Sequence, residues 1–137
     1  MATFNKINDF VQDIGIGVHN LASDQIVVAL TNTAIVATNG QLSDLTSVLD
    51  GTNLSGATPY NVTTTSFTNS SGTSTLVLAD LVLTATGAVG PFRYVGIYNG
   101  TATNDELIGW IDYGSSISLA DTETFTVDFS ASTITLV

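Results

Sequence analysis

The segment from Gly90 to Phe129, which reads GPFRYVGIYNGTATNDELIGWIDYGSSISLADTETFTVDF, constrains the fold of this chain more than any other. Apolar and polar residues alternate in three aromatic-containing runs, and turn-forming pairs such as Asn99-Gly100 separate them. A period of two is that of a β-strand with one buried face, and Asn-Gly favours a tight turn. The segment therefore predicts three strands and contains no recognisable catalytic motif, and Ile134 and Leu136 continue the alternation to the end.

Further strands are predicted upstream. Gln25 to Thr33 is rich in β-branched residues, which indicates a buried strand. Tyr60 to Phe67 is dominated by Thr, which is typical of an exposed or edge strand, and Asn69 to Gly72 predicts a turn. Thr75 to Ala79 and Leu81 to Ala85 predict either one bent strand or two short ones.

The N-terminal segment, residues 1–22, is predicted to be helical. Thr3 is the expected N-cap, and Gly15 and Gly17 predict that the helix ends or loosens there. The residues at spacings of three and four that predict one apolar stripe are Phe4, Ile7, Val11, Ile14, Val18 and Leu21.

The predicted fold is therefore mainly β with one N-terminal α-helix, as an antiparallel β-sandwich or a partly closed barrel. A chain of 137 residues fits one domain. We expect a helical segment at residues 1–22 followed by a β domain at residues 25–137.

The irregular stretch from Ala34 to Gly56 is the candidate contact loop. Ser43 is expected to cap a short helical turn that runs through Leu45, Val48 and Leu49 and ends at Asp50-Gly51. Long loops in small domains usually carry function or an interface. We therefore predict partner contacts on this loop and on the N-terminal segment, with Thr3, Phe4, Asn5, Leu42, Leu45, Leu49 and Leu54 as the contact residues.

The charge balance argues against two classes of partner. Twelve acidic residues face two basic ones, Lys6 and Arg93, so the formal net charge is −10. Nucleic-acid binding needs clustered Lys and Arg, and anionic lipid would repel such a protein. We expect neither nucleic acid nor a membrane as partner.

The remaining composition favours association with proteins. Charged residues make up 10% of the chain, against about 25% in ordinary soluble domains, and Ser, Thr, Asn and Gly replace them. Such a surface is less costly to desolvate, because interface cores are depleted of charge. No apolar run approaches the ~20 residues that span a bilayer, and no signal-peptide pattern is visible, so we expect a soluble protein that forms oligomers or docks.

The candidate chemical groups do not combine into a motif. His19 is the only histidine and cysteine is absent, so His19 is expected at the surface or at a helix end without a role. Asp105-Glu106 could hold calcium but lacks the EF-hand pattern, so a hydrated loop tip is favoured. Asp112 and Asp128 could form a glycosidase pair, although outward-facing strand carboxylates are the simpler interpretation. We expect no enzyme, metal site or cofactor.

Four aromatic residues, Tyr94, Tyr98, Trp110 and Tyr113, fall in neighbouring predicted strands. They could form a platform that stacks on sugars or an interface hot spot. Core packing is the favoured interpretation, and a sugar platform remains the alternative.

The chain resembles the small virion proteins of tailed bacteriophages, and within them most closely the capsid decoration, or cement, proteins. The resemblance covers nearly the whole chain. It rests on FNKINDFVQDIGIGVHNL at the N-terminus, LTNTA at Leu30 to Ala34, GPFRYVGIYN at Gly90 to Asn99, LIGWIDYGSSISL at Leu107 to Leu119 and TFTVDF ending at Phe129.

This resemblance implies a β-rich structural protein, made in the host bacterial cytoplasm, that binds the outer surface of the capsid in the virion. It would cement neighbouring subunits of the major capsid protein, often as a homotrimer. A tail or head-completion subunit is the closest alternative, and a carbohydrate-binding adhesion module using Trp110 is an alternative from another class.

Overall fold

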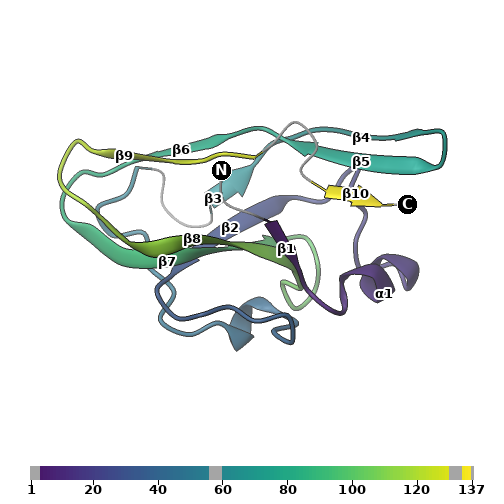
Figure 1. Ribbon diagram of the computed structural model, residues 1–137, viewed down its shortest axis with the longest axis horizontal. Helices are drawn as coiled ribbons and strands as arrows, with labels where there is room; N and C mark the ends of the chain where they lie inside the picture. The colour runs from purple at the N-terminus through teal and green to yellow at the C-terminus, as the bar shows by residue number, and fades with distance from the viewer. Residues whose placement is uncertain (1–3, 56–59, 130–133, 137) are drawn as a thin grey trace.

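The computed structural model describes residues 4–55, 60–129 and 134–136, and it shows a mainly β protein with one short helix (Figure 1). Its sheets are antiparallel and do not close into a barrel. The prediction of an antiparallel sandwich is therefore confirmed, and the barrel is not formed.

The strands form three sheets. Figure 1 shows the two smaller sheets end to end along the upper side, with the largest sheet below them. The largest sheet has the order β1 (Phe4–Lys6), β8 (Leu107–Leu119), β7 (Val89–Asn99), β2 (Ile26–Thr31) and β3 (Tyr60–Val62). The three-stranded sheet has the order β10 (Ile134–Leu136), β5 (Thr73–Leu78) and β4 (Thr64–Ser70), and the two-stranded sheet pairs β6 (Leu81–Thr84) with β9 (Thr124–Val127).

One long bent hairpin runs through all three sheets. Strands β5, β6 and β7 follow one another along its first arm and pair with β10, β9 and β8 of the second arm. The two arms are also hydrogen-bonded where the hairpin bends: the Thr122 N–H donates to the Ala85 oxygen at 2.8 Å. The alternating pattern at the C-terminus therefore belongs to one arm of this hairpin, and residues 100–106 form its tip.

The core lies between the two layers and extends beneath the N-terminal segment. All six residues of β2 are buried, which confirms the buried strand predicted from Gln25 to Thr33. The rings of Phe92 and Phe125 meet edge to face, with centroids 4.9 Å apart. Ile7 and Phe10 belong to the same core cluster as the strands, so the N-terminal segment shares the core of the β domain.

The predicted N-terminal helix is present but is much shorter than residues 1–22. Residues Phe4–Lys6 form β1, and the helix α1 spans only Phe10–Gly15. Asp9 occupies its N-cap position, whereas Thr3 lies outside the described residues. Strand pairing of Phe4 with Ile111 overrides the helical spacing, and Val11 of the expected buried stripe is 52% exposed. The predicted end of the helix near Gly15 is confirmed.

Two further expectations change in detail, and one open alternative is decided. The run from Tyr60 to Phe67 is two strands rather than one, because the chain passes at Thr63 from the edge of one sheet to the edge of another. The two apolar runs after Gly72 are separate strands, β5 and β6. The helical turn in the loop is a 3-10 turn, η1 (Leu42–Asp44), and Gln41 rather than Ser43 is its N-cap.

Candidate functional site

Three segments that are distant in sequence meet at one place, and we call residues 8–17, 36–45 and 100–106 the hairpin-tip junction. The Asn8 N–H donates to the Ala37 oxygen at 2.9 Å, and the Leu42 N–H donates to the Asp105 oxygen at 3.0 Å. The Leu107 N–H donates to the Gly40 oxygen at 2.9 Å. The junction joins the two regions that the sequence predicts as partner contacts, the N-terminal segment and the 34–56 loop.

The predicted contact residues lie mostly on the inner side of these regions. Phe4 and Asn5 are half-buried in β1, and the Asn5 amide donates to the Trp110 oxygen at 3.5 Å. The leucines anchor the loop to the core: three are half-buried and one is buried, namely Leu42, Leu45, Leu49 and Leu54. Thr3 lies outside the described residues.

Outward-facing apolar residues of the loop were missed from the sequence. Val36 and Val48 are 50% and 38% exposed, whereas the leucines of the loop are half-buried or buried. Gly96 makes this arrangement possible, since a Cβ atom there would lie 3.1 Å from Leu45 Cδ1 and 3.4 Å from Ile35 Cδ1. Side-chain size could have indicated this arrangement from the sequence, because Leu is larger than Val and the larger apolar side chains of a loop gain more free energy from burial.

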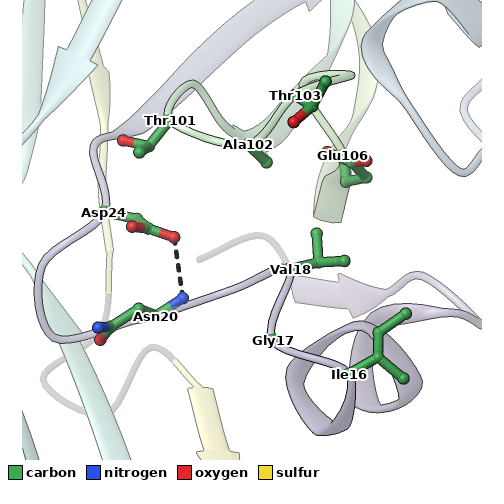
Figure 2. Close-up of a pocket in the computed structure, with 9 residues that line it drawn as sticks. All are labelled: Ile16, Gly17, Val18, Asn20, Asp24, Thr101, Ala102, Thr103 and Glu106. Atoms are coloured by element: carbon green, nitrogen blue, oxygen red, sulfur yellow. Dashed lines mark hydrogen bonds between the residues drawn. The ribbon is translucent and has the colours of Figure 1, made fainter.

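A cavity of about 410 Å³ lies between the turn after α1 and the hairpin tip (Figure 2). Figure 2 shows Asp24 and Asn20 on one side of it and Glu106 with Val18 on the other. The Asp24 carboxylate accepts the Asn20 N–H at 2.8 Å, drawn as the dashed line. The lining is mixed, with carboxylates and hydroxyls beside short apolar groups.

Asn99, which is fully buried, ties this region together. Its amide nitrogen donates to Asp24 Oδ2 at 2.7 Å and to His19 Nδ1 at 3.0 Å. Its amide oxygen accepts the Thr101 N–H at 2.9 Å and the Ala102 N–H at 3.2 Å. One side chain therefore holds the hairpin tip against the turn that follows α1.

His19 is buried, with 5% of its surface exposed, so the expected surface position is wrong. The chain turns back after α1 and places the ring 5.5 Å from that of Phe10. Because Asn99 donates to Nδ1, the hydrogen-bond network assigns the ring proton to Nε2. Nε2 has no hydrogen-bond partner in the part of the chain that the structure describes, and Asp13 Oδ2 is 3.9 Å away.

Burial dominates the electrostatics of this pair. Burial lowers the pKa of His19, and the Asp13, Glu106 and Asp24 carboxylates act in the opposite direction. Burial raises the pKa of Asp13, which His19 partly offsets. A histidine with a lowered pKa is neutral near pH 7, so the ring acts as a packed, hydrogen-bonded core group.

A second cavity of about 290 Å³ lies between the loop and the large sheet. Leu42, Val48 and Leu49 contribute apolar walls, and Tyr60 and Tyr98 line it from the strands. The Tyr60 hydroxyl is buried without a hydrogen-bond partner among residues 4–55, 60–129 and 134–136. Burial raises the pKa of both phenols.

Three of the four aromatic residues pack in the way the favoured interpretation predicts. Tyr98 is buried, and Trp110 and Tyr113 are half-buried against the core. Tyr113 meets the Phe125 ring at 5.1 Å, edge to face. Tyr94 is half-buried, with the Arg93 guanidinium 5.2 Å from its ring centroid.

The other chemical candidates lie apart from the junction or inside local turns. Arg93 Nε donates to Asp112 Oδ1 at 2.7 Å, and this bond lowers the pKa of Asp112. Asp128 is exposed after β9. The Glu106 carboxylate accepts from the Asn104 amide at 3.2 Å, within the loop tip that the sequence predicts.

The described residues contain neither a metal-binding cluster nor a membrane-spanning helix. No group of three or more His, Asp or Glu side chains among them is arranged to hold a metal ion. No helix among them combines the length and apolarity needed to cross a membrane.

The fold defines the protein as a small antiparallel β-sandwich domain. Comparison with known proteins gives no matching family model, no similar characterised protein and no similar solved structure.

Proposed function

We propose that this protein is a structural subunit of a tailed-bacteriophage virion that binds the outer capsid surface and cements neighbouring major-capsid subunits. The observation that supports this most is the hairpin-tip junction. There the two regions with predicted contacts form one continuous, hydrogen-bonded surface. The protein acts by binding, without catalysis or a cofactor.

The junction carries charge of one sign only. Residues 8–17, 36–45 and 100–106 include no Lys or Arg. They include five carboxylates, namely Asp9, Asp13, Asp44, Asp105 and Glu106. Complementary charge across an interface gives specificity and speeds association. The junction therefore suits a basic patch on the capsid, and Val36 supplies an exposed apolar contact beside it.

The junction is also ordered before it binds. The Asp44 carboxylate accepts the N–H groups of Gly40 and Gln41 at 2.8 and 3.1 Å, which fixes the centre of the loop. A flexible loop that becomes ordered only on binding loses conformational entropy, which weakens binding, whereas a preformed loop avoids this cost. Many copies on one shell then multiply a modest contact energy per copy.

Binding to capsids that lack the protein tests this function. We expect purified protein to sediment with expanded capsids and to raise their resistance to heat or chelator, and to bind less as salt rises. No binding, together with unchanged capsid resistance, would refute the proposal. Labelling of virions places the protein on the shell if the proposal is right, and labelling on the tail would assign it to a tail or head-completion role instead.

Two matched pairs of variants locate the contact. Val36→Ser should weaken binding to capsids, while Val82→Ser, which changes a residue of similar exposure on β6, should not. Asp9→Lys should weaken binding more than Asp121→Lys, although both change the net charge equally and both positions are exposed. Equal effects on binding within each pair would show that the junction is not the surface that contacts the capsid.

The resemblance favours a homotrimer. The mass of the purified protein and its arrangement on capsids by electron microscopy test the number of copies.

A further inference from the structure

The negative charge of this protein is absent from one long stretch of its sequence. Between Asp50 and Asp80 there is no Asp, Glu, Lys, Arg or His, although the chain carries a formal net charge of −10. This stretch contains β3, β4 and β5. Uncharged polar residues, chiefly Thr, Ser and Asn, take the place of charged ones on the surface of β4.

Strand β4 is the outermost strand of its sheet, and Figure 1 shows it along the upper margin of the molecule. It is seven residues long, whereas the other outermost strands, β1, β3, β6, β9 and β10, have three or four. It pairs with β5 on one side, and in residues 4–55, 60–129 and 134–136 no strand pairs with its other side. A row of backbone N–H and C=O groups therefore borders that side.

Apart from an irregularity in its pairing between Thr64 and Ser66, β4 lacks the features that normally protect an edge strand. Natural edges are blunted by charged residues, Pro, bulges or short length. β4 has no charged residue and no Pro, and its pairing with β5 runs without interruption from Ser66 to Ser70, after a single irregularity at Thr64. By contrast, the edge strand β1 contains Lys6.

We infer that β4 is an interface between two copies of this chain, with β4 of one copy pairing antiparallel with β4 of the other. The charge distribution selects this partner. A second copy also carries −10, so two copies approach with least repulsion where neither has charge. A basic partner would instead bind where the carboxylates are.

The alternation of β4 suits such a contact. Phe67 faces the same side as its partner Leu76, which is fully buried, so a second copy would cover the half-exposed part of the Phe67 ring. Thr68 lies opposite Thr75 on the other face and is exposed. Paired Thr side chains and an aromatic contact are typical stabilising pairs between neighbouring strands. Two-fold symmetry would join the two three-stranded sheets into one sheet.

Sedimentation of the purified protein over a range of concentrations tests this interface. The wild type should reach twice the 14.2 kDa mass of the chain, or an even multiple of it. Thr68→Lys and Thr68→Glu should each raise the dissociation constant about tenfold or more, because symmetry brings like charges together. Ser118→Lys, at an exposed position of β8, should leave it unchanged.

Mixing the two charged variants separates loss of pairing from loss of folding. An equimolar mixture of Thr68→Lys and Thr68→Glu should form mixed pairs, because opposite charges then face each other across the two strands. Association of the wild type should strengthen as salt rises, since salt screens the repulsion between two acidic copies. A wild type that stays monomeric, an oligomer that the Thr68 variants do not weaken, or association that salt weakens would each overturn the inference.

Discussion

Replacing Asn99 by Ala should be among the most destabilising single changes in this domain. Asn99 is fully buried and its side chain makes four hydrogen bonds shorter than 3.3 Å, one of them to the Asp24 carboxylate. A hydrogen bond to a charged group contributes about 1.5–3 kcal/mol and a neutral one about 1 kcal/mol. Asp24 is half-buried and Thr101 is exposed, so in the variant water can replace part of the hydrogen bonding that these residues lose with the Asn99 side chain. We therefore expect a loss of about 3 kcal/mol in the free energy of unfolding.

Urea unfolding at neutral pH measures this loss. The midpoint should fall while the slope stays constant, because the change removes contacts without altering the surface exposed on unfolding. Asn104→Ala is the matched control, since Asn104 lies exposed in the same loop and should cost less than about 0.5 kcal/mol. A loss below about 1 kcal/mol for Asn99→Ala would refute the view that this side chain holds the hairpin tip to the turn after α1.

Two further predictions concern packing and pH. Gly96→Ala should lower the free energy of unfolding by about 1–3 kcal/mol, because the added methyl group meets Leu45 and Ile35 beneath the loop. Gly15→Ala, where no atom lies within 4 Å of the added Cβ, should be neutral or stabilising by up to about 1 kcal/mol in the same urea experiment. The pKa of His19 is lower in the folded protein, so the unfolded chain binds more protons between the two pKa values. The stability that comes from neutral His19 is therefore present above the unfolded pKa and is lost as the pH falls. Between about pH 7.5 and 5.5, the urea midpoint should fall more for the wild type than for His19→Gln. An equal fall in both proteins would exclude His19 as the cause.

The features that the sequence predicts well are those that depend on neighbouring residues. The alternation of Phe125 and Val127 with Thr124 and Thr126 predicts which residues of β9 are buried, and the structure confirms it. The buried run of β2 follows in the same way, and the turn predicted at Asn69 to Gly72 is confirmed at Ser71 and Gly72, while Asn69 and Ser70 belong to β4. A strand in which polar and apolar residues alternate has one buried face, and a strand that is apolar throughout is buried on both faces, so the pattern alone predicts burial.

The features that it predicts poorly depend on distant partners. The spacing of Phe4 and Ile7 fits a helix equally well, and only pairing with β8, about a hundred residues later, makes Phe4 part of a strand. The burial of His19 likewise depends on Asn99, eighty positions away. For the 34–56 loop, the sequence identifies the region but not its orientation, because its leucines were predicted as partner contacts and the structure packs them against the core.

The distribution of charge separates the two surfaces proposed for this protein. The hairpin-tip junction is acidic, which suits a partner of opposite charge, and β4 is uncharged, which suits a second copy. If the protein is a capsid decoration protein as proposed, the junction would attach it to the shell and β4 would link its copies to one another. If trimers occupy three-fold positions, β4 pairing would join neighbouring trimers across the two-fold positions between them. Thr68→Lys should then leave attachment of the protein to capsids intact but reduce the added resistance to heat, whereas Asp9→Lys should reduce both.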